Sequence, residues 1–255
     1  MRELSASQQK LVRSLHRKRR RDEHNLCFIE GLTLCEEALQ QSIPLEFAVV
    51  DQSGPAARDD AAIRRALDDA SVEVFTAAPN VFARISDTST PQGILAVMPR
   101  PQAQADASKS VVVLDGVADP GNVGTIIRTA LWFGFRQILL GPGSADPWGP
   151  KALRAGMGAT FQAATISADD LPAALEAQFG GQKRCGAVLG AERRLADIKG
   201  APPLSIVLGN EAQGISAAVR EMLNESYEIP GSGMLESLNV AAASAVSLYH
   251  FSQFT

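Results

Sequence analysis

Cysteine and histidine are both scarce in this sequence, with three of each among 255 residues. The three cysteines form no CxxC pair and cannot all pair with one another. We therefore expect free thiols in a reducing compartment and no disulfide scaffold. No group of histidine, cysteine and carboxylate residues has the spacing of zinc ligands, so the sequence predicts no structural or catalytic metal.

Long hydrophobic runs are also missing. No apolar stretch approaches the length that spans a bilayer, and the first residues, MRELSASQQK, lack the apolar core of a secretory signal. The basic N-terminal region is interrupted by Glu3, Asp22 and Glu23, which is untypical of an organelle transit peptide. We expect a cytoplasmic protein with no membrane partner.

Two common glycine-rich motifs for nucleotides are missing as well. No GxGxxG follows the apolar run 111–114, and no acidic residue stands in a ribose-binding context. The glycines near residue 210 are not followed by Lys-Ser or Lys-Thr, so they do not form a P-loop. A Rossmann-type enzyme acting on a small molecule therefore has little support.

The net charge of -4 conceals an uneven distribution. Residues 1–24 contain eight Lys and Arg against three acids, so the rest of the chain carries nine net negative charges. A basic segment on an acidic body is typical of proteins whose contact with nucleic-acid phosphate is local. On charge alone, a solvated helix with no partner stays an open alternative.

The pattern of apolar runs predicts an α/β fold in two domains. Over residues 1–100, strand-like runs alternate with helix-like stretches, including helices over 5–20 and 56–69. Residues 101–110 are polar and rich in Pro and Ala, and we interpret them as a linker. In the second domain, 111–255, four continuous apolar runs suit buried strands of a parallel sheet: 111–114, 137–140, 185–189 and 205–208. The apolar helix predicted over 238–254 must be buried against the sheet or against a partner subunit.

Three separated segments place turn and amide residues between a strand-like and a helix-like run: 119–128 (DPGNVGTIIR), 208–214 (LGNEAQG) and 236–241 (ESLNVA). At such junctions the backbone can approach a ligand, and helix N-termini offer free N–H donors. Taken singly, Asn122 and Ser237 could be helix N-caps and Glu211 an ordinary loop acid, neutralised by a basic partner such as Arg128. Three such junctions in one chain predict one composite site.

These segments, in this order, resemble the three motifs of the SpoU/TrmH branch of the SPOUT RNA methyltransferases. The N-terminal part, with FIEG at 28–31 and QGILA at 92–96, resembles the L30e-like RNA-binding domain that often precedes them. The resemblance implies a small L30e-like α/β domain followed by an α/β trefoil-knot methyltransferase domain with a parallel sheet. It also implies S-adenosylmethionine bound in the knot and a homodimer formed through the C-terminal domain. The implied reaction is methyl transfer to a ribose 2′-hydroxyl of RNA, for which we favour rRNA over tRNA.

The resemblance also implies roles for residues of this chain. Catalysis would rest on Arg128, supported by Asn122, Glu211, Ser237 and Asn239. The cofactor contacts would fall at Leu208, Gly209, Ile229, Pro230 and Leu238. RNA phosphates would be held by Arg13, Arg17, Lys18, Arg19, Arg20, Arg21, Lys151 and Arg154.

Two positions depart from the pattern of the family. Gly231 stands where methionine commonly follows Ile-Pro, and Gly156 stands where serine is usual. The first departure could loosen the cofactor loop, and the second could alter contacts to RNA phosphate. A non-catalytic RNA-binding or ribosome-assembly protein that keeps this fold is the alternative. The residues do not distinguish a housekeeping modification from one that confers antibiotic resistance.

Overall fold

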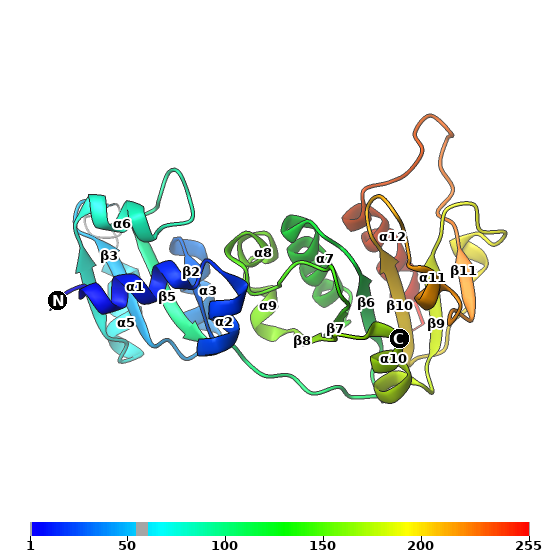
Figure 1. Cartoon of the computed structure of the whole chain (residues 1–255), viewed down its shortest axis with the longest axis horizontal. Helices are drawn as coiled ribbons and strands as arrows, with labels where there is room; N and C mark the ends of the chain where they lie inside the picture. Colours follow the sequence, from blue (N-terminus) through cyan, green and yellow to red (C-terminus); the bar gives the residue numbers. More distant parts are fainter. Residues whose placement is uncertain (1, 55–60, 255) are drawn as a thin grey trace. The chain divides into compact units, whose positions relative to one another are not determined.

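The computed structural model describes residues 2–54 and 61–254, which form two compact units (Figure 1). The first unit comprises Met1–Pro101 with Trp148–Phe161, and the second comprises Gln102–Pro147 with Gln162–Thr255. Of the helix predicted over 56–69, residues 56–60 lie outside the described residues. None of the helices in the described ranges is long and apolar enough to cross a membrane.

Within the described residues, the first unit contains a five-stranded mixed sheet in the order β1-β4-β3-β5-β2. Its strands are β1 (Arg2–Glu3), β2 (Leu26–Glu30), β3 (Phe47–Asp51), β4 (Val74–Ala77) and β5 (Ile94–Pro99). β1, β4 and β3 run parallel, whereas β5 is antiparallel to both of its neighbours, β3 and β2. The short edge strand β1 was not predicted from the sequence, because two residues carry no periodic signal.

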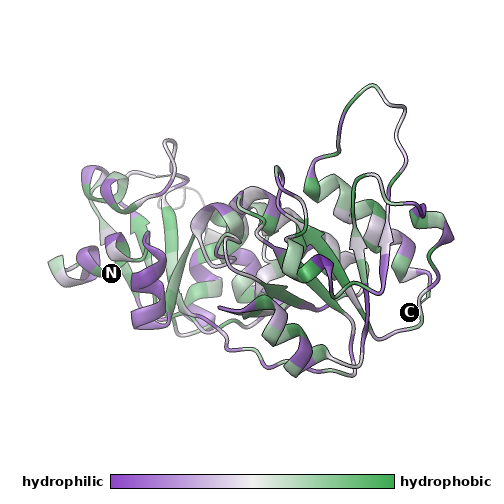
Figure 2. Ribbon diagram, turned by 45° about the vertical axis from the view of Figure 1, so that its right-hand side comes forward, coloured by the Kyte–Doolittle hydropathy of each residue, from purple (hydrophilic) through white to green (hydrophobic). Residues whose placement is uncertain are grey.

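The strands of this sheet bury both faces. On β2, Phe28 contributes to one hydrophobic core and its neighbours Cys27 and Ile29 to the other, as the two-residue period of a strand requires. Helices on the two faces complete these cores: α1 (Ala6–Ser14) and α6 (Pro79–Ile85) on one, α3 (Leu32–Gln40) and α5 (Ala61–Asp69) on the other. In Figure 2 the strands of the sheet are mostly green, which marks their apolar composition.

The single helix predicted over 5–20 is wrong: two helices occupy this stretch. α1 ends at Ser14, and α2 (Lys18–His24) begins after Arg17, whose backbone is extended. Leu15, at the corner, is fully buried, and the Arg21 guanidinium donates a hydrogen bond of 2.7 Å to its carbonyl oxygen. These tertiary contacts stabilise the corner, and the amphipathic pattern alone does not reveal them.

A segment from the middle of the second unit's sequence packs in the first unit. It contains α8 (Pro150–Gly156) and most of α9 (Ala159–Gln162). Trp148, Leu153 and Phe161 enter the core that contains Ile29 and Leu34. The first unit is therefore completed by residues far from it in sequence.

In its described residues, the second unit contains a six-stranded sheet in the order β11-β9-β10-β6-β7-β8, with every neighbouring pair parallel. Its strands are β6 (Val111–Asp115), β7 (Gln137–Leu140), β8 (Ala164–Ser167), β9 (Lys183–Ala187), β10 (Leu204–Gly209) and β11 (Glu225–Tyr227). The four apolar runs correspond to β6, β7, β9 and β10, which confirms the predicted α/β fold with a parallel sheet. The outer strands β8 and β11 were missed because they are short and only partly buried.

Helices cover both faces of this sheet. α10 (Leu171–Phe179) and α11 (Ala217–Arg220) share one core with Val113 and Val207 of the central strands. α7 (Pro120–Trp132) packs along α12 (Val240–Ser252), which also contacts β10, and the single-turn 3-10 helix Leu195–Asp197 lies against α12. Adjacent strands β6 and β10 therefore lead into helices on different faces, and the carboxyl ends of such strands are where ligands bind in open parallel sheets.

Candidate active site

The loop that follows β10 is a tight turn that only glycine permits at its first position. The backbones of Asn210 and Gly214 exchange two hydrogen bonds, of 3.0 and 2.9 Å. This pairing brings the turn so close to Gly209 that a Cβ atom there would lie 2.2 Å from the Gly214 carbonyl carbon and from the Ile215 nitrogen. Gly209 is thus required by the close approach of two backbone segments.

The loops after β6 and β10 are tied together by side chains that the sequence analysis did not single out. Asn210 donates through Nδ2 to the Gly116 carbonyl at 2.7 Å, and its Oδ1 accepts from two N–H groups of its own turn. Asp115, at the end of β6, accepts a 2.7 Å hydrogen bond from the Ser216 N–H. Ser144 bonds both the Leu114 carbonyl and the Gly116 N–H. The only sequence signal for Asp115 and Asn210 is their position at, or directly after, the end of a buried strand.

Glu211 holds the first turn of α7 in place. Its carboxylate accepts hydrogen bonds from the Ala118 and Asp119 N–H groups, at 3.2 and 3.3 Å, and from Asn122 Nδ2 at 2.9 Å. Partial burial acts to raise the pKa of Glu211, but the hydrogen bonds from Asn122 and the backbone outweigh it and hold this pKa below its ordinary value. Glu211 is therefore ionised at neutral pH.

The expected pairing of Glu211 with Arg128 is not found among the described residues. The carboxylate accepts from amide groups instead, and Arg128 is exposed on α7 with no hydrogen bond or ion pair to a described side chain. The amides at the start of α7 already neutralise part of the charge on Glu211. The Arg128 guanidinium is consequently left for a group from outside the unit.

Asn122 links the first motif to the third. Its Oδ1 accepts a 3.1 Å hydrogen bond from Asn239 Nδ2, while its own Nδ2 donates to Glu211. Both ends of the Asn122 amide are thus fixed, and one hydrogen-bonded chain connects Glu211, Asn122 and Asn239. The three segments picked out from the sequence converge at this chain.

The helix caps differ from those considered on sequence alone. Asp119 caps α7 by accepting from the Asn122 N–H at 3.0 Å, and Asn239 caps α12 by accepting from the Ala241 and Ala242 N–H groups. Asn122 and Ser237, the two residues proposed as caps, therefore do not have that role. Ser237 lies exposed in the loop before α12, within reach of solvent.

The residues expected to hold the cofactor surround the same end of the sheet. The Leu208 side chain is buried, so only its backbone could take part in binding a ligand. Ile229 is half-buried and Pro230 is exposed, and Leu238, at 52% exposure, lies in the loop that leads to α12. A Cβ at Gly231 would meet nothing within 4 Å, so the backbone around this departure from the family pattern has free space. Among the described residues no group of three potential ligands could hold a metal ion.

The basic residues of the N-terminal helices are placed unequally. Arg13 and Arg17 are exposed, with no ion pair to a described residue. The next three cations pair with acids one turn along α2: Lys18 with Asp22 at 2.9 Å, Arg19 with Glu23 at 2.8 Å, and Arg20 with Glu23 at 2.5 Å. Arg21, only 4% exposed, is part of the corner between α1 and α2. The basic run is thus partly neutralised by its own helix.

Lys151 and Arg154 both lie on α8 and belong to the first unit. Lys151 is exposed, whereas Arg154 donates to Asp87 at 2.8 Å. The buried Gly156 ends α8. The hydrogen-bonded chain of Glu211, Asn122 and Asn239 belongs to the second unit.

Fold and site together define an α/β protein with a candidate ligand-binding site at the carboxyl ends of the central parallel strands. Residues 109–249 match the model of the SpoU rRNA Methylase family, and residues 7–96 match the MRM3-like substrate binding domain. Because the first match covers more than half of the chain, this protein belongs to the SpoU family of rRNA methylases.

Known proteins similar to this chain agree with that assignment. The 23S rRNA (guanosine(2553)-2′-O)-methyltransferase RlmP of Bacillus subtilis is 32% identical over 249 residues, which cover 96% of this chain and 97% of RlmP. A solved structure of a TrmH-family protein from Porphyromonas gingivalis matches with a TM-score of 0.84 at 34% identity, over 99% of both chains. The AdoMet-bound rRNA methyltransferase of Sinorhizobium meliloti matches with a TM-score of 0.80 at 25% identity, over 98% of this chain and 95% of that one.

Proposed function

We propose that this protein is an S-adenosylmethionine-dependent methyltransferase that modifies a ribose 2′-hydroxyl of rRNA. The observation that carries the proposal is the convergence of three distant segments, joined from Glu211 through Asn122 to Asn239, at the carboxyl ends of the adjacent strands β6 and β10. Membership of the SpoU family and the 2′-O-methyltransferase activity of RlmP support the same reaction. Transfer RNA remains the second choice of substrate.

The residues present suit S-adenosylmethionine. The Gly209 turn exposes backbone groups, and the loop before α12 contains the exposed apolar side chains of Leu235 and Leu238. Such a combination suits a ligand with an apolar body and a few polar groups. Leu208, Gly209, Ile229, Pro230 and Leu238 would hold the cofactor, which supplies an electrophilic methyl group on a sulfonium. The trefoil knot stays a prediction.

The ribose hydroxyl is a weak acid, and it must lose its proton as its oxygen attacks the methyl group. A guanidinium stays protonated at neutral pH, so the exposed Arg128 suits an electrostatic role: it orients the hydroxyl and stabilises the developing alkoxide. An RNA phosphate or a water molecule then takes the proton. Positioning and preorganised charge account for most of the acceleration in this mechanism.

Asn122, Glu211 and Asn239 act as positioning residues in this scheme. Glu211 fixes the start of α7, the helix that carries Arg128. It accepts from the N–H groups of the two residues before the helix and from the Asn122 amide in its first turn. Asn239 fixes the start of α12 and the loop that precedes it. Ser237, exposed in that loop, is available to contact the substrate.

Two further properties belong to the proposal. The apolar residues Trp132, Val246 and Tyr249 of α7 and α12 are 84%, 43% and 58% exposed, which is unusual for a free surface and suits a homodimer formed through the C-terminal unit.

The exposed Arg13 and Arg17 are the first candidates for binding RNA phosphates. A cytoplasmic location is retained as a prediction.

The test is a pair of measurements on the full chain. Calorimetric titration with S-adenosylmethionine should show saturable binding, and total RNA from cells with and without the gene should differ at one 2′-O-methyl position. A chain that binds rRNA but takes up no S-adenosylmethionine would be the non-catalytic RNA-binding protein instead.

A further inference from the structure

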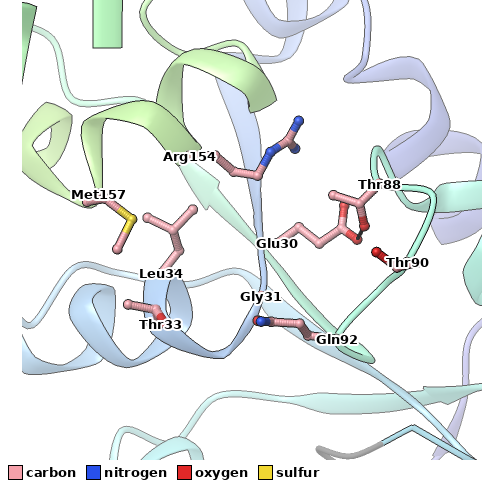
Figure 3. A pocket seen from close by; sticks show the side chains of 9 residues that line it. All are labelled: Glu30, Gly31, Thr33, Leu34, Thr88, Thr90, Gln92, Arg154 and Met157. Atoms are coloured by element: carbon pink, nitrogen blue, oxygen red, sulfur yellow. Dashed lines mark hydrogen bonds between the residues drawn. The ribbon is translucent and has the colours of Figure 1, made fainter. Parts of the chain in front are cut away.

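The first unit contains a cavity of about 270 Å³ at the start of α3 (Figure 3). It is bounded by the end of β2, the first turn of α3, the loop between α6 and β5, and the end of α8. All of these belong to the same compact unit. None of the residues named above for catalysis or for the cofactor lines it, so its chemistry needs a separate explanation.

One side of the cavity is apolar. It is formed by Leu34, which is buried, and by Met157, which follows α8 in the left-handed conformation (φ 48°) and is 42% exposed. The two side chains lie opposite Glu30, Thr88 and Arg154 in Figure 3. A flat apolar ligand would be covered by them, because a leucine and a flexible methionine adapt to an aromatic face.

The other side presents an acceptor. Glu30, 6% exposed, is anchored by the Ser86 and Thr88 hydroxyls, which donate to Oε1 at 2.5 and 2.8 Å, and by the Asp87 N–H, which donates to Oε2 at 2.8 Å. Oε2 thus accepts one hydrogen bond from the protein, whereas Oε1 accepts two. A carboxylate oxygen can accept twice, so Oε2 keeps a place for a ligand N–H.

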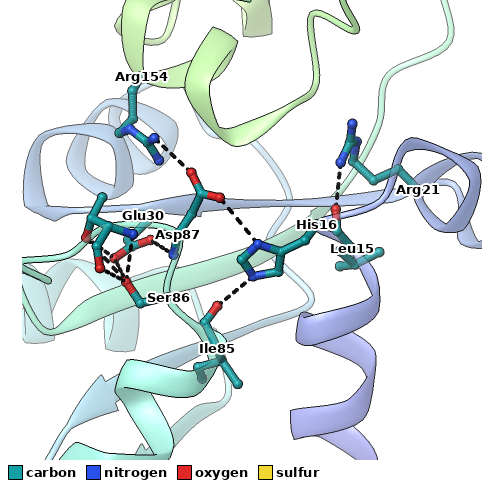
Figure 4. A network of polar contacts seen from close by, with 9 residues as sticks. Leu15, His16, Arg21, Glu30, Ile85, Ser86, Asp87 and Arg154 are labelled. Atoms are coloured by element: carbon teal, nitrogen blue, oxygen red, sulfur yellow. Dashed lines mark hydrogen bonds and ion pairs between the residues drawn. The ribbon is translucent and has the colours of Figure 1, made fainter.

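Two other residues that line the cavity, Arg154 and Gln92, carry donors. Arg154 donates through Nη2 to Asp87, while its Nη1 is buried and has no hydrogen-bond partner among the described residues. Asp87 also lies 3.3 Å from His16 Nδ1, and His16 Nε2 lies 3.0 Å from the Ile85 carbonyl oxygen (Figure 4). These contacts fix Asp87, which in turn fixes the Arg154 side chain. A buried guanidinium N–H without an acceptor is costly unless a ligand supplies one.

Gln92 provides the second donor. Its Oε1 accepts from the Leu32 N–H at 2.9 Å, which fixes the side chain and leaves Nε2 without a hydrogen bond to a described residue. The cavity therefore offers one acceptor and two donors around an apolar slot.

We propose that this cavity binds one unpaired uracil base of the RNA substrate, whose edge places a ring N–H next to a carbonyl. The N–H donates to Glu30 and the carbonyl accepts from Arg154 or Gln92, while Leu34 and Met157 cover the face of the ring. A phosphate fits less well, because the buried carboxylate of Glu30 would repel it. Proteins read single-stranded RNA in this way, by hydrogen bonds to base edges and contact with base faces. The inference rests on the proposed function and adds a recognition site to it.

The test separates base from phosphate contact. Fluorescence anisotropy with the full-length chain would compare the affinities for three labelled RNA 12-mers. One contains only uridine, one contains only cytidine, and in the third every nucleotide lacks its base. The three have the same phosphates. The wild-type chain should bind the uridine 12-mer about tenfold more tightly than the abasic one, the discrimination expected of one base contact. It should also bind uridine more tightly than cytidine.

Three variants are compared. Arg154→Met should lower the affinity for the uridine 12-mer about tenfold and the affinity for the abasic 12-mer less than twofold. Thr33→Leu, at an exposed lining residue with no partner to lose among the described residues, should weaken uridine binding in the same selective way by narrowing the cavity. The control Arg84→Met removes an exposed cation outside the cavity and should affect all three RNAs equally.

Two results would overturn the inference: a wild-type chain that binds the uridine and abasic 12-mers equally, or an Arg154→Met variant that weakens both by the same factor. The second would mean that Arg154 holds a phosphate. Titration of each variant with S-adenosylmethionine separates this outcome from failure of the proposed function, because the cavity does not include the cofactor residues.

Discussion

Replacing Asn122 with aspartate tests the hydrogen-bonded chain at its centre. Asn122 donates to Glu211 at 2.9 Å through one end of its amide and accepts from Asn239 at 3.1 Å through the other. Asn122→Asp keeps the shape and the acceptor but puts a second carboxylate against Glu211. Activity and stability should therefore fall together at neutral pH.

The expected loss follows from two terms. A hydrogen bond to a charged acceptor contributes about 1.5–3 kcal/mol. Two negative charges about 3 Å apart add about 1.4 kcal/mol of repulsion at the dielectric constant of water. Because Glu211 is exposed, the lower ends of these ranges apply, and we expect the free energy of unfolding to fall by about 3 kcal/mol. Asn239→Asp is the matched control: it loses one neutral hydrogen bond, but its carboxylate faces the N-terminus of α12, so the loss should stay within about 1 kcal/mol.

A second substitution should restore part of the free energy of unfolding that Asn122→Asp loses. In Asn122→Asp/Glu211→Gln the amide donates in the opposite direction, while one of the two backbone N–H groups at the start of α7 loses its acceptor. Urea unfolding of the four proteins should show that the double variant regains about 2 kcal/mol over Asn122→Asp. The reasoning is refuted if Asn122→Asp is as stable as Asn239→Asp, or if the double variant is no more stable than Asn122→Asp.

The same series has a defined pH dependence. The hydrogen bonds hold the pKa of Glu211 below its unfolded value, so their stabilising contribution is present above that value and is lost as the pH falls through the folded pKa. In Asn122→Asp the two facing carboxylates can share a proton, so their repulsion weakens over the same acidic range. The stability difference between wild type and variant should thus shrink on acidification, as urea unfolding at neutral and acidic pH would show.

Three other experiments test the rest of the proposal. Arg128→Lys should retain measurable methyl transfer at raised pH, and complete inactivity with intact RNA binding would contradict the electrostatic role. Gly209→Ala, whose new Cβ would lie 2.2 Å from backbone atoms, should weaken S-adenosylmethionine binding at least tenfold in calorimetry, whereas Gly231→Ala, which has free space, should not. Trp132→Arg combined with Tyr249→Arg should convert a dimer to a monomer in size-exclusion chromatography with light scattering; a persistent dimer would place the interface elsewhere.

The central strands of the second unit could be predicted because their environment leaves a clear pattern. β6 and β7 are buried on both faces, so their residues are continuously apolar, and the predicted runs 111–114 and 137–140 match them closely. The outer strand β11 was missed because it is three residues long and partly exposed. Periodicity thus reveals elements whose burial is uniform and misses those at the edge of the sheet.

The convergence of the three segments could be predicted, but not the contacts within it. The positions of Asn122, Glu211 and Asn239 after apolar runs indicated that they would converge. Which partner each would take depends on distances of a few tenths of an ångström between loops far apart in sequence. For this reason the pairing of Glu211 with Arg128 that we expected from the sequence is not found. The carboxylate accepts from amides at the start of α7 instead.

The packing of 148–161 changes how the basic residues are interpreted. By sequence position, Arg154 belongs with the methyltransferase motifs, but its helix completes the core of the first unit, and its guanidinium is bound to Asp87 there. The ion pairs within α2 are exposed, and such pairs contribute at most about 1 kcal/mol, so an RNA phosphate could replace Asp22 or Glu23 at little cost. Arg154 differs, because one of its N–H groups is buried without an acceptor. The surface cations therefore suit sequence-independent attraction to RNA, and the enclosed arginine suits recognition of one particular group.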